Sequence, residues 1–178
     1  VRPRNLESEV NVGIDEGLWY LHRTQIRRGS PQLDGYWGGA TGATAANITA
    51  LQVNGHFESG DAENPYTETV SRGMRYILTR LFRQNLSVQT LGNPDSNGNG
   101  YGLYTDYPDG YQCGILMDAI IASGTPNAVA SVGIGEVLGR RYVDIIQDMV
   151  DYYAYSLYDS AGGGYPVLGG WRYSAQQF

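Results

Sequence analysis

The feature that most constrains this chain is a segment with helical spacing that occurs three times. Residues 14–21, IDEGLWYL, align with residues 70–77, VSRGMRYI, and the two central glycines lie 56 positions apart (73 minus 17). Residues 146–153, IQDMVDYY, form a third copy, in which Met149 replaces the glycine. The apolar residues of each copy recur at intervals of three and four, which places them on one face of a helix.

A shorter segment follows the first two copies. Residues 50–55, ALQVNG, align with residues 119–124, AIIASG, and each segment ends in a glycine that suits the C-terminal end of a helix. The repeating unit is therefore predicted to be a long amphipathic helix, a glycine-aromatic loop and a short, more apolar helix. Because one such unit cannot bury its apolar face alone, neighbouring units must stack on one another.

The predicted fold is all-α: a single domain over residues 1–178, built from about two and a half helical hairpin repeats. The length suits one domain with a sizeable core. The repeats cover about residues 11–56, 64–125 and 141–178, and the third is incomplete because it lacks its short helix. The predicted helices span residues 11–28, 43–54, 64–81, 113–122 and 141–158.

The composition excludes several classes of partner and site. The formal net charge is -6, from 12 basic and 18 acidic residues, which argues against nucleic acid because backbone binding needs a surplus of cations. No stretch approaches the roughly 18 apolar residues of a membrane-spanning helix, so no membrane span is predicted. The single cysteine, Cys113, excludes an internal disulfide and any site that needs several thiolates.

Motif residues near the ends of the first and third long helices carry a resemblance to a known family. In the first repeat Gly17 is followed by Gln25 and then by Gly35-Tyr36-Trp37. This pattern resembles the prenyltransferase and squalene-oxidase repeat, the helical hairpin that builds the α/α toroids of terpene cyclases and protein prenyltransferases. Gln25 and Trp37 resemble the QW motif of the cyclases, although nine residues separate Gln25 from Gly35.

The resemblance implies a structural role for these residues. A glutamine amide can bond free backbone groups at a helix end, while a tryptophan covers the junction with a large apolar surface. The sequence GGWRYSA, which contains Gly170 and Trp171, resembles the same loop in bacterial proteins of this group. Both ends of the chain are therefore expected to carry the same kind of helix-to-loop junction.

The resemblance also implies catalytic motifs that this chain lacks. A cyclase of this kind would carry an Asp-x-Asp-Asp acid motif, which is absent. A prenyltransferase would bind zinc through aspartate, cysteine and histidine. Asp109 precedes Cys113 by four residues, a different spacing from the family's, and neither His22 nor His56 has metal-ligand spacing to Cys113. We therefore do not expect zinc, since a lone cysteine on an apolar helix is usually a small buried side chain.

Two functional classes remain open. A non-catalytic module for binding or structural assembly is favoured, because the scaffold is well marked while the catalytic motifs are missing. The alternative is an enzyme with its site in the toroid cavity, either resembling a terpene cyclase or prenyltransferase, or acting as a polysaccharide lyase or hydrolase. The catalytic candidates for the alternative are Asp109, Cys113 and Asp118, and paired carboxylates for sugar chemistry could also include Asp34 and Asp106.

The sequence DSNGNGYGLYTD, residues 95–106, has the spacing of a calcium-binding loop. The ligand positions fall on Asp95, Asn97, Asn99, Tyr101 and Asp106, with a glycine at the sixth position. Calcium prefers oxygen ligands that alternate along a sharply turned backbone, which this spacing supplies. The alternative is an Asn-Gly-rich turn between two helices. Because only two of the ligands are charged, any calcium binding is expected to be weak.

An incomplete stack of repeats leaves an apolar end to be covered. The occupant is expected to be further sequence of the same protein, another copy of the chain or a different protein. The first residue, Val1, is not methionine, and together with the calcium-type loop this favours an extracytoplasmic or secreted location.

Overall fold

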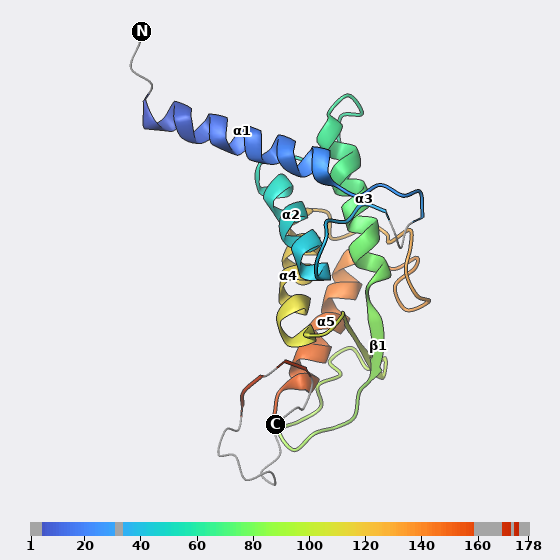
Figure 1. Ribbon diagram of the computed structural model, residues 1–178. Helices are drawn as coiled ribbons and strands as arrows, with labels where there is room; N and C mark the ends of the chain where they lie inside the picture. Colours follow the sequence, from blue (N-terminus) through green and yellow to red (C-terminus); the bar gives the residue numbers. More distant parts are fainter. Residues whose placement is uncertain (1–4, 31–33, 159–168, 172, 175–178) are drawn as a thin grey trace.

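The computed structural model describes residues 5–30, 34–158, 169–171 and 173–174 of the chain. Within them lie five helices and one antiparallel pair of strands (Figure 1). The elements are α1 (Leu6–Thr24), α2 (Thr41–Val53), α3 (Pro65–Thr79), β1 (Phe82–Asn85), β2 (Tyr101–Tyr104), α4 (Asp109–Ala122) and α5 (Tyr142–Ser156). The protein is helix-rich as expected, but the prediction of a purely all-α fold is wrong because β1 and β2 form a small sheet.

The sheet lies between α3 and α4, where a glycine-rich loop was expected. β1 and β2 pair with Phe82 opposite Tyr104 and Asn85 opposite Tyr101. Aromatic residues favour the pleated backbone and pair across strands, and the ring centroids of Phe82 and Tyr104 are 5.7 Å apart. Strands of only four residues are too short to stand out against the helical periodicity of their neighbours, which is why the sequence did not reveal them.

Local capping residues determine where the first and third helices begin. The Asn5 side chain accepts a hydrogen bond from the Ser8 N–H at 2.8 Å, so α1 begins at Leu6 rather than near residue 11. The Asn64 side chain accepts from the Tyr66 N–H at 3.0 Å, and Pro65 occupies the first position of α3, as the sequence Asn64-Pro65 predicts. α1 ends at Thr24, because the backbone of Gln25 turns out of the helix with a ψ of 130°.

α2 and α4 pack side by side in the middle of the molecule, with α3 and α5 against them (Figure 1). The Gly42 N–H in the first turn of α2 donates to Oε1 of Gln112 in the first turn of α4 at 2.8 Å, so the two helices begin next to one another. Fully buried side chains of all four helices form the core, among them Ile48, Leu51, Met74, Ile77, Leu116, Ile145 and Met149.

α1 differs from the other helices because much of it extends beyond the body of the molecule (Figure 1). Leu18 is buried, but the same apolar face continues through Leu6, Val10 and Ile14, which are exposed. The aligned glycines show the same difference: a Cβ at Gly73 would lie 2.7 Å from Cγ1 of Ile48, whereas a Cβ at Gly17 would meet nothing within 4 Å. α1 therefore presents an uncovered apolar face in the described part of the chain.

Candidate functional site

Most of the predicted motif residues lie in the segments that follow the long helices α1, α3 and α5. We name these segments the first connection (residues 25–40), the second connection (residues 80–108) and the third connection, which follows α5 and is described at residues 157–158, 169–171 and 173–174. Their geometry decides which predicted residues share a site.

In the first connection Gln25 and Trp37 join the end of α1 to its neighbours. The buried Gln25 side chain donates from Nε2 to the carbonyl oxygens of Gly35 at 3.0 Å and Thr69 at 2.8 Å. The indole Nε1–H of Trp37 donates to the Leu21 carbonyl at 2.9 Å. Both polar groups are therefore used to hold the end of α1 against its own connection and against α3, so neither is free for chemistry.

A glycine is required where the first connection passes closest to α3. Gly35 has a φ of +85°, and a Cβ at this position would overlap the backbone of Arg72. Its N–H donates to the Ile26 carbonyl, and the Ile26 N–H donates to the Tyr36 carbonyl, each at 2.8 Å. These two bonds close the loop directly after α1.

The third connection repeats these contacts. Gly169 has a φ of +86°, and its N–H donates to the Tyr158 carbonyl at 2.9 Å. The Tyr158 N–H donates to the Gly170 carbonyl at 3.0 Å, and the Trp171 Nε1–H donates to the Tyr153 carbonyl at 2.9 Å. The backbone of Leu157 leaves α5 with a ψ of 130°, as that of Gln25 leaves α1. The same turn out of the helix, bridge, left-handed glycine and indole hydrogen bond therefore occur after both α1 and α5.

The second connection carries a longer form of the same bridge. Phe82, which aligns with Ile26 at the 56-residue spacing (82 minus 26), pairs with Tyr104, and the pairing continues through all of β1 and β2. Thr105 takes the place of Trp37: its N–H donates to Sγ of Cys113 at 3.3 Å, and the Trp37 N–H donates to Oγ1 of Thr44 at 3.2 Å.

The environment of Cys113 is that of a structural residue. Cys113 aligns with Thr44 at the 69-residue spacing of the short helices (113 minus 44), and its sulfur accepts the equivalent hydrogen bond. Its side chain is fully buried, and burial raises the pKa of the thiol to about 12. Because the thiolate is the nucleophile and the metal ligand, a thiol that stays protonated at neutral pH is poorly suited to either role.

Of the other two catalytic candidates, Asp109 lies close enough to Cys113 for its charge to help raise the pKa of the thiol. Asp109 is buried and accepts a hydrogen bond from the Tyr152 hydroxyl, whereas Asp118 is exposed. Both histidines, His22 and His56, contact the ring of Tyr66. Among the described residues, no group of three or more His, Cys, Asp and Glu side chains is arranged to hold a metal ion.

The calcium-type loop is folded around Asp95. The Asp95 carboxylate accepts hydrogen bonds from the N–H groups of Gly98, Asn99 and Gly100 at 2.9 to 3.1 Å. The side-chain oxygens of Asn97 and Asn99 accept from the backbone two residues ahead, at 3.1 and 2.9 Å. The structure therefore brings Asp95, Asn97, Asn99 and the backbone of Tyr101 together in one compact turn.

Asp106, the predicted twelfth-position ligand, has other partners. Its carboxylate accepts from Nε of Arg80 at 2.9 Å and from Nη2 of Arg80 at 2.5 Å, and the Thr41 hydroxyl donates to it at 2.5 Å. Asp106 thereby fastens the end of α3 to the start of α2. Asp34, another carboxylate considered for sugar chemistry, is likewise paired with Arg72.

Two acidic residues of α5 that the sequence did not single out hold the calcium-type loop in place. Asp148 is fully buried; its carboxylate pairs with Arg140 and accepts from Nδ2 of both Asn97 and Asn99 at 2.7 Å. Asp151 accepts from the Ser96 hydroxyl at 2.7 Å. Asp148 and Asp151 lie three and six residues after the buried Ile145, and therefore on the apolar face of α5. Acidic residues on an apolar helix face are the sequence signal that could have identified them.

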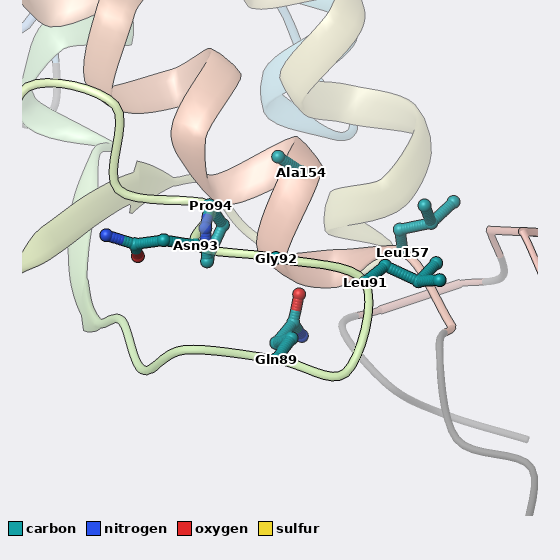
Figure 2. A pocket seen from close by; sticks show the side chains of 7 residues that line it. All are labelled: Gln89, Leu91, Gly92, Asn93, Pro94, Ala154 and Leu157. Carbon is teal, nitrogen blue, oxygen red and sulfur yellow. The ribbon is translucent and has the colours of Figure 1, made fainter.

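A shallow pocket of about 200 Å³ lies between the second connection and the last turns of α5 (Figure 2). Gln89, Leu91 and Asn93 line it on one side, and Ala154 and Leu157 line it on the other. Gln89 donates from Nε2 to the Tyr155 carbonyl at 2.7 Å. No titratable side chain is among the residues that line this pocket, so it offers no acid, base or nucleophile.

No helix in the described part of the chain has the length and apolar character needed to cross a bilayer. No protein-family model, characterised protein or solved structure significantly matches the chain.

Proposed function

We propose that this chain is a non-catalytic helical repeat module, of the α/α toroid type that its prenyltransferase-repeat resemblance implies, and that it binds a further helix between α4 and α5. The observation that carries the proposal is an apolar groove of about 260 Å³ between these helices. Ile120 and Ile121 line it from α4, and Val143 and Ile146 line it from α5. We call this surface the α4–α5 face.

The α4–α5 face corresponds to a surface that is covered elsewhere in the same molecule. Ile121 aligns with Gln52 of α2 at the 69-residue spacing (121 minus 52), and α4 packs along α2. Gln52 is 2% exposed, whereas Ile121 is 61% exposed. Ile146 aligns with Val70 of α3, which is fully buried, while Ile146 is only partly buried. Positions that are covered on α2 and α3 are therefore uncovered on α4 and α5.

The chemistry of the α4–α5 face favours an apolar occupant. Burial of apolar surface contributes roughly 25 cal/mol per Å², and full burial of one isoleucine side chain contributes about 1.5–3 kcal/mol. Ile121 and Val143 both line the groove, and both side chains are exposed. An occupant that covered both side chains would gain most of the free energy of burying them. Contiguous apolar patches of this kind commonly mark sites of association.

The third connection supports a helix as the occupant. The first connection leads into α2, and the third connection repeats its bridge and indole hydrogen bonds. The Tyr173 carbonyl accepts from the Gly110 N–H at 3.1 Å, and the Tyr173 ring lies 5.5 Å from that of Tyr111. The third connection therefore reaches the N-terminal end of α4, where a helix parallel to α4 would start. The matching arrangement of α2 and α4 supplies the template.

Binding to a helix is testable with a peptide that has the sequence of α4, residues 109–122, because α4 fills the corresponding position on α2. We expect a fluorescently labelled peptide, under reducing conditions, to bind the wild-type chain measurably by fluorescence anisotropy. The variant Ile121→Asp places a charge in the groove and is expected to weaken binding at least tenfold.

The matched control is Val53→Asp, since Val53 is also an exposed apolar residue of a short helix but does not line the groove. Equal peptide affinity for Ile121→Asp and Val53→Asp would contradict the proposal. Concentration-dependent self-association of the wild-type chain that Ile121→Asp abolishes would instead identify a second copy as the occupant.

A further inference from the structure

A second groove, separate from the α4–α5 face in its chemistry, is polar. It has a volume of about 260 Å³ and lies where the segments after α2 and after α4 meet α3 and the first turn of α5. Glu58, Ser71, Arg75 and Tyr142 are among the residues that line it. This volume is slightly below the roughly 300 Å³ at which small-molecule sites commonly start, so the pocket suits only a ligand of a few heavy atoms.

Two residues that line this pocket each carry a buried polar atom that has no partner. Oε1 of Glu58 and Nε of Arg75 are both shielded from solvent and make no hydrogen bond to any described residue. Buried donors and acceptors in proteins are almost always paired, by protein, water or ligand. An unpaired acceptor and an unpaired donor on two residues that line the same pocket point to a ligand that presents a donor to Glu58 and an acceptor to Arg75.

The protein holds both groups in position from separate elements. The Tyr142 hydroxyl donates to Oε2 of Glu58 at 3.0 Å, and Tyr142 itself is buried at the start of α5. Arg75 lies one helical turn after Ser71 on the same face of α3. No ion pair within 4.0 Å involves Glu58 or Arg75 among the described residues, so neither charge is neutralised by the protein.

We propose that this pocket binds a small zwitterion with one carboxylate and one ammonium group, the chemical class of a free α-amino acid. The ligand carboxylate accepts from Nε–H of Arg75, and the ligand ammonium donates to Oε1 of Glu58. A neutral polyol would satisfy the hydrogen bonds but would leave both protein charges unneutralised. A simple anion or cation would neutralise one charge and face repulsion from the other.

Calorimetric titration of the purified chain tests this proposal with glycine, L-alanine and L-serine as zwitterionic probes. Acetate, ethylammonium and glucose are the comparison probes, because each has only part of the required chemistry. We expect heat of binding from at least one zwitterion and an affinity at least tenfold weaker for each comparison probe. Glu58→Gln and Arg75→Gln are each expected to weaken zwitterion binding at least tenfold, as for hydrogen bonds between charged groups.

The matched controls are Glu136→Gln and Arg83→Gln, which remove an exposed ion pair outside the pocket by the same chemical changes. Both are expected to bind as the wild type does. Ser71→Leu fills the pocket without changing either charged group, so its loss of binding in a chain with an unchanged melting temperature would separate a site effect from misfolding. Absence of heat with all three zwitterions, equal binding of glucose, or equal weakening by the control variants would overturn the proposal.

Discussion

The first and third connections share their bridge and indole hydrogen bonds but have different surroundings. In each, a tryptophan indole donates to the carbonyl three residues before the end of the preceding helix, Leu21 before Thr24 and Tyr153 before Ser156. Trp37 is 7% exposed, whereas Trp171 is 54% exposed. The local sequence therefore suffices to form the junction, while burial of its tryptophan depends on the helices that pack around it.

The largest expected difference between the two connections is the cost of removing the tryptophan. Trp37→Ala should lower the free energy of unfolding by about 3–5 kcal/mol, as for other buried aromatic side chains. Trp171→Ala should cost about 1 kcal/mol or less, because much of its side chain is already in contact with solvent. Urea unfolding of both variants measures the difference, and equal costs would show that the hydrogen bond rather than the burial dominates.

The aligned glycines of α1 and α3 offer the next largest contrast. Gly73→Ala should destabilise the chain by about 1–3 kcal/mol, because its methyl group would press on Ile48. Gly17→Ala should be neutral or stabilising by up to about 1 kcal/mol, since alanine favours helix and no described atom opposes it. Thermal melting of the two variants checks the sign of each effect, and a loss of stability in Gly17→Ala would contradict an uncovered α1.

A smaller effect is expected at Glu58, whose bond to Tyr142 links the covered region after α2 to the start of α5. Burial raises the pKa of Glu58, and the Tyr142 hydrogen bond opposes this shift. The Glu58 carboxyl therefore stays protonated to a higher pH in the folded chain than in the unfolded chain, where the pKa of glutamate is about 4.3. Stability from this group is present below that pH and falls as pH rises through the folded-state pKa.

Glu58→Gln keeps an acceptor for Tyr142 but removes the titration. Its advantage over the wild type in free energy of unfolding should therefore increase as pH rises above about 4.3. Urea unfolding across this range gives the slope, with Glu136→Gln as the exposed control. A stability difference that does not change with pH would contradict the burial of this carboxyl.

The smallest expected effect concerns the second connection, which differs from the other two by its calcium-type loop. We expect calcium to raise the melting temperature slightly by binding to residues 95–106, and Asp95→Ala to abolish that rise. Asp106→Ala should retain it, because the Asp106 carboxylate already pairs with Arg80. Calorimetry with calcium checks the binding directly, and no heat together with no shift would leave the loop as a turn alone.

What the sequence predicted well was local. The helices follow from apolar spacing, and the beginning of α3 follows from Asn64-Pro65, because both depend on neighbouring residues. The sheet was missed because each strand has four residues. The partners of Asp106 were missed because Arg80 lies 26 residues away (106 minus 80) and Thr41 65 residues away (106 minus 41). Trp37 and Trp171 differ in exposure because other helices cover only Trp37. Neither motif contains a sequence signal for this covering.

Cys113 carries a thiol where the aligned Thr44 carries a hydroxyl, and this thiol can serve as a natural chemical reporter. The sulfur sits fully buried beside the second connection, its pKa is raised to about 12, and it is the only cysteine in the sequence. An alkylating reagent can reach it only when α4 and the second connection separate, so the labelling rate measures how often the centre of the molecule opens. Any helix that docks on the α4–α5 face would lower the labelling rate of Cys113, so docking could be detected without introducing a label.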